Sequence, residues 1–156
     1  MSDFSQILFP VDLSPSSPKV VPYVRRMADK FGARVHLLFV ARDLSHFGGI
    51  NVPFTTINNL EEALAKGAEV GLEKFRDKHF ADVPTKIAVL CGDIPEQILD
   101  YAKNESVDLI IMGTHGRKGI EKVLLGSVAE RVVKGSLVPV MVVNPHRTVK
   151  SGVLPL

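Results

Sequence analysis

The chain is poor in cysteine: its 156 residues include one, Cys91, and only 6% of them are aromatic. A single cysteine cannot form a disulfide within the chain, and it cannot build a thiolate metal site alone. We therefore expect a cytoplasmic protein in a reducing compartment, although a secreted protein with few cysteines would have the same composition.

An excess of either charge is also missing. Nineteen Lys and Arg residues against 17 Asp and Glu residues leave a net charge of +2, which is too balanced for a protein whose main task is to grip nucleic acid by its phosphates. The longest uncharged stretch, residues 44–60, contains glycine, proline and asparagine, so it predicts a loop and not a membrane span. The first residues lack a basic region followed by an apolar core, so no signal peptide is expected.

What the sequence does contain is five short, nearly continuous apolar runs, at residues 7–11, 35–40, 87–90, 107–112 and 138–143. Runs of this kind are typical of strands buried on both faces, as in a parallel sheet. Pro139 lies in the last run, and because proline cannot donate to a strand ladder, this run predicts an edge strand.

Helical patterns separate these runs, at residues 20–31, 60–75, 94–102 and 128–133. Gly32 supplies a left-handed stop for the first, and Asn59 is a plausible cap for the second. In the second helix, Leu60 and Leu64 begin the apolar stripe. Asp93 and Glu96 are spaced as a capping pair, and Ser127 and Glu130 fit a capping box. Strict alternation of strands and helices predicts an α/β fold, a parallel sheet with helices on both faces.

Ligands of such sheets bind beyond the carboxyl ends of the strands, where the direction of winding reverses. The first run ends at Asp12, and the fourth ends at Gly113, followed by Gly116 and by Gly126-Ser127. Glycines let the backbone approach a ligand, and a helix N-terminus offers N–H groups to an anion. With Arg117 and Lys118 nearby, these residues predict a phosphate site, while Asp12 can accept hydrogen bonds from a ribose.

The spacing Gly113-x2-Gly116-x9-Gly126-Ser127 resembles the nucleotide-binding signature of the universal stress protein family, in its ATP-binding branch. The opening Ile7-Leu8-Phe9-Pro10-Val11-Asp12, the block at residues 108–117 and the closing residues 138–143 are also similar to that family. The resemblance covers residues 3–145. It implies a universal stress protein domain over residues 1–145 with a tail at 146–156. It also implies a Rossmann-like open sheet of order 3-2-1-4-5, similar to adenine-nucleotide α-hydrolases.

The resemblance also implies roles for individual residues in binding ATP, ADP or AMP, with or without Mg²⁺. Asp12 would bond the ribose, with Pro10 and Val11 beside it. Val40 would lie against adenine, and Met112 and Gly113 would line the nucleoside. The phosphates would be held by Gly116, Gly126, Ser127 and Val128. We add Arg117 from its charge and position. The resemblance further implies a homodimer, for which the edge strand at residues 138–143 is the expected contact, since an exposed edge invites pairing.

Each residue also has an ordinary structural explanation. Ser127 can be an N-cap, Asp12 can cap a helix, the glycines can be turn residues, and Arg117 and Lys118 can form a solvated loop surface. His115 has the pKa range of a catalytic base, but the sequence shows no partner for it, so no catalytic residue is predicted.

The expected function is that of an ATP-binding regulatory switch in the stress response. The alternative is a slow Mg-dependent ATPase or a nucleotide-transfer enzyme on the same fold. The sequence lacks a Gly-x4-Gly-Lys-[Ser/Thr] loop and has no second carboxylate placed by motif to hold a metal. A phospho-acceptor signalling domain is disfavoured, because no lysine stands at the end of the last run, at Val143-Asn144-Pro145.

Overall fold

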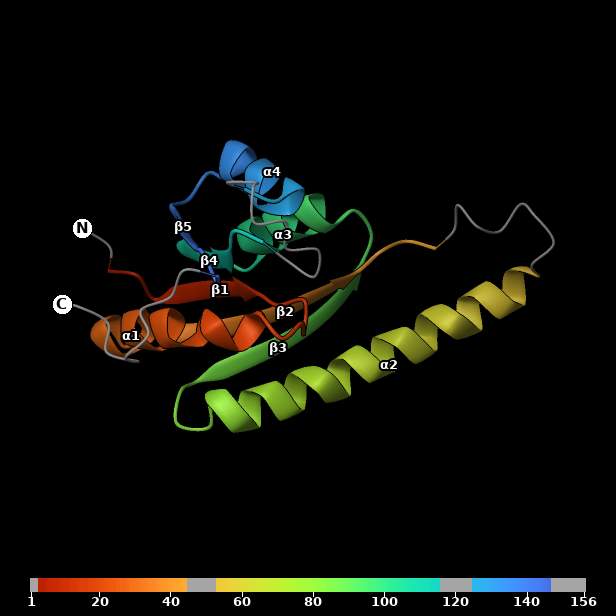
Figure 1. Cartoon of the computed structure of the whole chain (residues 1–156), viewed down its shortest axis with the longest axis horizontal. Coiled ribbons are helices and arrows are strands. Elements are labelled where there is room, and N and C mark those ends of the chain that lie inside the picture. Colours follow the sequence, from red (N-terminus) through yellow and green to blue (C-terminus); the bar gives the residue numbers. More distant parts are fainter. Residues whose placement is uncertain (1–2, 45–52, 116–124, 147–156) are drawn as a thin grey trace.

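Five parallel strands form the centre of the fold (Figure 1). The computed structural model describes residues 3–44, 53–115 and 125–146. The elements follow in the order β1 (Gln6–Pro10), η1 (Ser17–Lys19), α1 (Val21–Phe31), β2 (Arg34–Ala41), α2 (Phe54–His79), β3 (Thr85–Cys91), α3 (Ile94–Asn104), β4 (Leu109–Gly113), α4 (Ser127–Gly135) and β5 (Val140–Val143). The strand order is β3-β2-β1-β4-β5, which confirms the predicted fold.

Both faces of the sheet are covered, as near-continuous apolar strands require. Ile7 and Phe9 of β1 point into a core with α1 and α2, while Leu8 between them points into a second core with α3 and α4. Figure 1 shows α1 and α2 on one side of the sheet and α3 and α4 on the other. Within the described residues, no helix is long and apolar enough to cross a membrane.

The second helix begins earlier than the sequence predicts. It starts at Phe54, after Pro53, so the prediction of a cap at Asn59 is wrong and the predicted loop at residues 44–60 is shorter. Proline has the right φ for a helix start, and this signal outweighs the weak helix propensity of the residues that follow. The first half of α2 extends beyond the sheet (Figure 1). Leu60 and Leu64, which the sequence places in the apolar stripe of this helix, are therefore about half exposed, at 51% and 48%.

Other local predictions are confirmed. Gly32 ends α1 in the left-handed conformation, with φ +61°. The Asp93 carboxylate accepts a hydrogen bond from the Glu96 N–H at 3.2 Å and caps α3. At the end of the sheet, β5 is an edge strand, but it starts at Val140 because Pro139 has no N–H to donate.

Polar groups tie together the amino ends of the strands. The Asp108 carboxylate, just before β4, accepts hydrogen bonds from the backbone N–H groups of Ser5 and Gln6 and from the Ser5 hydroxyl, at 2.9–3.1 Å. The Asp108 N–H in turn donates to the Gln6 carbonyl at 3.0 Å. These bonds set the starting points of β1 and β4 against each other.

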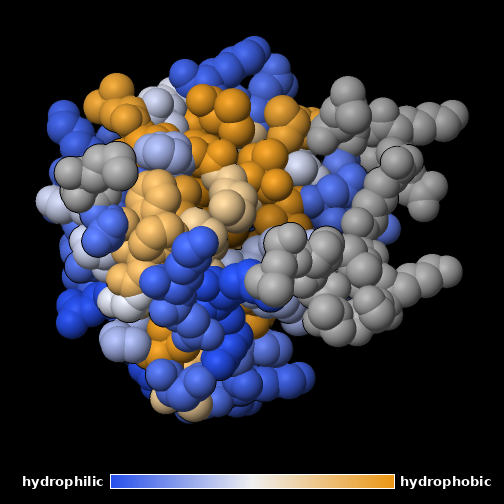
Figure 2. All heavy atoms as spheres, turned by 90° about the vertical axis from the view of Figure 1, so that its left-hand side faces the viewer, coloured by the Kyte–Doolittle hydropathy of each residue, from blue (hydrophilic) through white to orange (hydrophobic). Residues whose placement is uncertain are grey.

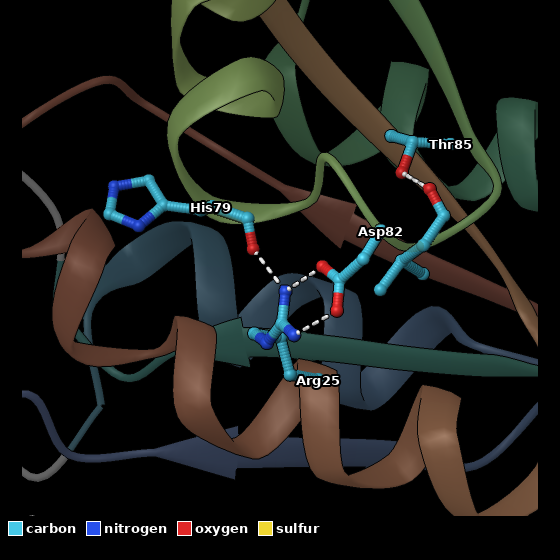
Figure 3. A network of polar contacts seen from close by, with 5 residues as sticks. Arg25, His79, Asp82 and Thr85 are labelled. Carbon is cyan, nitrogen blue, oxygen red and sulfur yellow. Dashed lines mark hydrogen bonds and ion pairs between the residues drawn. The ribbon is translucent and has the colours of Figure 1, made fainter.

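A second tie at this end joins α1 to the turn before β3 (Figure 3). The Arg25 guanidinium donates two parallel hydrogen bonds to the Asp82 carboxylate, both at 2.7 Å, and a third to the His79 carbonyl at 2.6 Å. This bidentate pairing lowers the pKa of Asp82 to about 2 and raises the pKa of Arg25. One side chain of α1 thus holds both the end of α2 and the turn that follows it.

His36 of β2 is buried in a polar network on the opposite face. Its Nε2 lies 2.7 Å from Gln6 Oε1, and its Nδ1 lies 2.9 Å from the Tyr101 hydroxyl. Because the amide oxygen can only accept, Nε2 carries the proton and Nδ1 of the neutral ring accepts from the tyrosine. Burial lowers the pKa of His36 and raises the pKa of Tyr101 to about 12.

The lowered pKa of His36 makes stability depend on pH. The unfolded chain takes up this proton near the ordinary pKa of about 6.5, before the folded chain does, so the folded state loses stability as pH falls below that value. His36→Gln removes this titrating group, so its contribution to the pH dependence of stability is absent from the variant. The difference in unfolding free energy between wild type and variant should therefore shrink from pH 7.5 to 5.5, with a slope of at most about 1.4 kcal/mol per pH unit. Urea unfolding at each pH measures it, and parallel curves would contradict the prediction.

Two glycines of α2 offer a matched comparison. A Cβ at Gly67 would meet nothing within 4 Å, whereas a Cβ at Gly71 would lie 2.9 Å from Cδ1 of Leu13. Gly67→Ala should stabilise the protein by about 0.5–1 kcal/mol through helix propensity. Gly71→Ala gains the same propensity but must displace the end of the Leu13 side chain, so it should be less stable than Gly67→Ala by up to about 1 kcal/mol. Thermal unfolding of the two variants tests this, and equal stabilities would be the contrary result.

Candidate functional site

The carboxyl ends of β1 and β4 lie side by side at the middle of the sheet, where the strand order reverses. Chains leaving these strands turn to opposite faces, since α1 covers one face and α4 the other. Asp12 follows β1, and Gly113 ends β4. The two predicted halves of the site are therefore brought to the same edge of the sheet, where open α/β folds bind ligands.

Asp12 stands at the start of a tight turn and is partly exposed. Its Oδ1 accepts hydrogen bonds from the Ser14 N–H at 3.0 Å and from the Ser17 hydroxyl at 2.8 Å. Within the described residues its Oδ2 has no hydrogen-bond partner. The carboxylate thus combines a structural role, ahead of η1, with an oxygen that can accept from a ligand.

The residue after Asp12 has an uncommon backbone. Leu13 has φ +58°, in the left-handed region that non-glycine residues seldom occupy. A Cβ at Gly71 of α2 would lie 2.9 Å from the Leu13 Cδ1, so the Leu13 side chain packs closely on this glycine. The left-handed backbone at Leu13 gives the turn after Asp12 its direction.

The opposite half of the site depends on a close approach between α4 and the end of β4. The Gly126 N–H donates to the Thr114 carbonyl at 2.6 Å, and a Cβ on Gly126 would lie 3.0 Å from that oxygen. Gly126 is also the N-cap of α4, so the predicted capping box at Ser127 and Glu130 is wrong by one position. A glycine can take the extended cap conformation while leaving no side chain between helix and strand.

Gly126 is the cap, so Ser127 is the first residue of α4. Ser127 is exposed. Its hydroxyl has no hydrogen-bond partner in the part of the chain that the structure describes. The N–H groups of a first helical turn lack acceptors within the helix and carry the positive end of the helix dipole. Ser127 and the first turn of α4 therefore form a set of donors suited to an anion.

An ion pair holds α4 in this position. Two nitrogens of the Arg131 guanidinium donate to the two oxygens of Asp93, at 2.9 and 3.0 Å. The pairing lowers the pKa of Asp93, the same residue that caps α3. One carboxylate thus caps the start of α3 and links it to the middle of α4.

Apolar residues predicted for the nucleoside lie around this edge. Val40 of β2 is level with Asp12, because Leu38 pairs with Pro10 two residues earlier. Val11 and Met112 are buried, and Pro10 and Val128 are half-buried. Val40 is 9% exposed and, with Met112, belongs to the core beneath α3 and α4.

Gly116, Arg117 and Lys118 lie outside the described residues. His115 just before them is buried, and its Nδ1 lies 2.8 Å from the Thr114 hydroxyl. Its ring also packs edge-on against His146, with 5.6 Å between centroids. The structure thus supplies partners for His115 that the sequence did not reveal. No group of three or more potential metal ligands occurs among the residues at 3–44, 53–115 and 125–146.

Three residues of the site were not predicted: Ser17, Leu13 and Gly71. A signal for Ser17 is present in the sequence, since an aspartate at a turn accepts from the backbone N–H two residues on, and a serine hydroxyl a few residues later can reach the same carboxylate. No local pattern connects Leu13 with Gly71, because the contact joins residues far apart in the chain.

Known proteins are similar to this chain in sequence and in fold. The sequence model of the universal stress protein family matches residues 3–144. Two relatives from Methanocaldococcus jannaschii, the universal stress proteins MJ0531 and MJ0577, are each 32% identical to this chain and cover 90% of it, with 82% and 95% of their own lengths matched. The solved structure of MJ0577 superposes with a TM-score of 0.80 at 29% identity, over 92% of this chain and 97% of that one.

More distant solved structures share the fold. One is a universal stress protein in complex with cAMP, with a TM-score of 0.65 and 18% identity over 92% of this chain and 99% of that one. Another, from Archaeoglobus fulgidus, is in complex with dAMP, with a TM-score of 0.53 and 19% identity over 90% and 98%. Fold, family match and relatives agree, and the chain belongs to the universal stress protein family.

Proposed function

We propose that this chain binds an adenine nucleotide, with ATP as the main ligand, and acts as a nucleotide-dependent regulatory switch in the stress response. The observation that carries the proposal is the placement of the Asp12 carboxylate and the first turn of α4 at one edge of the sheet, after neighbouring strands. The glycine spacing of the ATP-binding branch of the family supports ATP as the ligand. The cAMP and dAMP complexes of structural relatives support adenine nucleotides as the ligand class.

The residues fit the parts of a nucleotide. Asp12 Oδ2, which has no partner among the described residues, accepts from the ribose hydroxyls. The exposed Ser127 hydroxyl and the first N–H groups of α4 donate to phosphate oxygens. Val40 and Met112 provide apolar contacts for the nucleoside. Gly116 and Arg117 belong to the proposed phosphate loop by sequence, and Mg²⁺ would accompany the triphosphate.

We further propose that the protein forms a homodimer through β5. The sheet has two edges, and they differ in chemistry. β3 carries Lys86, which pairs with Glu105 at 2.8 Å, whereas all four residues of β5 are apolar. Charged residues on an edge oppose pairing with another strand, and an uncharged edge favours it. A two-fold axis would pair the β5 strands of the two copies antiparallel.

The surface around β5 supports this assembly. Figure 2 shows hydrophobic residues gathered on the face that lies at the left of Figure 1, where β5 is found. Exposed apolar side chains here include Val142 of β5, and Leu137 before it is 93% exposed. A hollow lined by Tyr23 and residues 141–144 lies beside the strand.

The proposed dimer edge and the proposed nucleotide site lie on neighbouring strands, β5 and β4. Gly113 of β4 is paired with Val143 of β5, and the Thr114 N–H donates to the Val143 carbonyl at 2.8 Å. Thr114 is the same residue whose carbonyl binds the N-cap of α4. A nucleotide bound against Gly113 and Thr114 would therefore also act on β5. This supports a switch in which nucleotide binding affects dimer assembly.

The nucleotide site is tested by removing its donors and acceptors. Calorimetry should show that wild type binds ATP, and nucleotide released by denaturing the purified protein should contain adenine. Asp12→Ala and Ser127→Ala should each weaken ATP binding by about tenfold, as expected for a lost hydrogen bond to a charged group. Ser127 is a better test of the phosphate assignment than Gly126, where any side chain meets the Thr114 carbonyl.

The matched control is Ser5→Ala, which removes a hydroxyl at the amino ends of the strands, where it donates to Asp108. This variant should bind ATP as wild type does. Absence of adenine nucleotide from wild type in both measurements would exclude the proposed function. Unchanged affinity in Ser127→Ala would exclude the phosphate position.

The dimer is tested at Val142. In a two-fold contact each substitution occurs twice, so Val142→Glu places like charges in one apolar interface and should yield monomers. Light scattering should give twice the 17.0 kDa chain mass for wild type and the chain mass for the variant. Val70→Glu changes a comparably exposed valine of α2, 49% against 40%, and should leave the dimer intact. A monomeric wild type would refute the assembly.

A further inference from the structure

The two oxygens of the Asp12 carboxylate have different surroundings. Oδ1 accepts from the Ser17 hydroxyl at 2.8 Å and from the Ser14 N–H at 3.0 Å. Oδ2 has no hydrogen-bond partner in the described part of the chain. The first oxygen is therefore held by the protein, and the second is left for a ligand.

The Ser17 hydroxyl is the part of this arrangement that a side chain supplies. Ser17 is 6% exposed and begins η1, and its own N–H donates to the Ser14 carbonyl at 3.0 Å. Its position is thus set by the backbone of the turn. The neighbouring Ser14 hydroxyl is used elsewhere, since it accepts from the Ser16 N–H at 3.3 Å.

A carboxylate without such a bond turns easily, because its terminal torsion is broad and two-fold. Holding Oδ1 restricts that torsion before a ligand arrives, and restricting a group in its bound arrangement improves affinity. The backbone of the same turn takes the left-handed conformation at Leu13, whose side chain packs on Gly71 of α2. Within this turn, Ser17 and the Ser14 N–H hold the carboxylate by Oδ1.

We propose that Ser17 is a positioning residue that holds Asp12 for the ribose hydroxyls and makes the site selective for ribonucleotides over nucleotides that lack these hydroxyls. The inference rests on the proposed function, because it assigns Asp12 to the ribose. It adds a residue and a discrimination between ligands.

The test compares ATP with an analogue that lacks both ribose hydroxyls. In calorimetry, wild type should prefer ATP, and Ser17→Ala should lose roughly three- to tenfold of its affinity for ATP, the worth of one hydrogen bond. Affinity for the analogue should stay unchanged, because the contact that Ser17 supports is absent from it. Ser16→Ala, which removes the adjacent hydroxyl, should match wild type with both ligands.

A second comparison separates positioning from structural damage. In an Asp12→Ala background, adding Ser17→Ala should cause no further loss of ATP affinity, since no carboxylate remains to be held. Should Ser17→Ala fail to fold, Ser17→Cys fills a similar volume with a weak donor and should show the same selective loss.

The outcomes are distinct. Equal losses for ATP and the analogue, unchanged ATP affinity in Ser17→Ala, or a further loss in the double variant would overturn the role of Ser17 while leaving nucleotide binding in place. A wild type that binds neither ligand would overturn the proposed function and this inference with it.

Discussion

β1 is buried on both of its faces, and the arrangement of the other elements follows from this constraint. Ile7, Leu8 and Phe9 are each at most 1% exposed, so apolar layers must cover the strand from above and below. Helices supply those layers: α1 and α2, which follow β1 and β2, cover one face, and α3 and α4, which follow β3 and β4, cover the other. The strand order reverses between β1 and β4, so the chain leaves the carboxyl ends of these two strands toward opposite faces. Asp12 and the start of α4 meet at these strand ends. The location of the candidate site is thus a consequence of how the core is covered.

Backbone geometry shapes the candidate site at the carboxyl ends of β1 and β4 as much as charged side chains do. Gly126 lets α4 approach the Thr114 carbonyl, and Leu13 adopts a left-handed conformation opposite Gly71. The charged side chains add to this backbone arrangement. The Asp12 carboxylate accepts hydrogen bonds from residues of its own turn, and the Arg131 guanidinium pairs with Asp93. A site of this kind can recognise a small anion although the net charge of the chain is near zero, because N–H groups at a helix start attract anions without formal charge.

The parallel sheet, the helical layers and the edge position of β5 could be predicted from the five short apolar runs and from Pro139, whereas the strand order was implied by the resemblance to the universal stress protein family. Two helix starts were predicted wrongly because more than one residue near each start can cap or begin a helix. Pro53 began α2 ahead of Asn59, and Gly126 took the cap position that Ser127 fits by pattern. The exposure of Leu60 and Leu64 was not predictable, since apolar spacing records a face of a helix but not how far the sheet extends beneath it. The contact of Leu13 with Gly71 required the tertiary structure.

Several polar ties of the fold lie away from the candidate site, with consequences for how the sequence can change over time. Asp108, His36 and the pair of Arg25 with Asp82 join elements at or near the amino ends of the strands, opposite the candidate site. Substitutions near the carboxyl ends therefore leave these ties intact. Proteins tolerate new functional residues where the added cost does not fall on the elements that hold the fold together. A family with this architecture can diversify its ligands at one end of the sheet while retaining the same scaffold at the other.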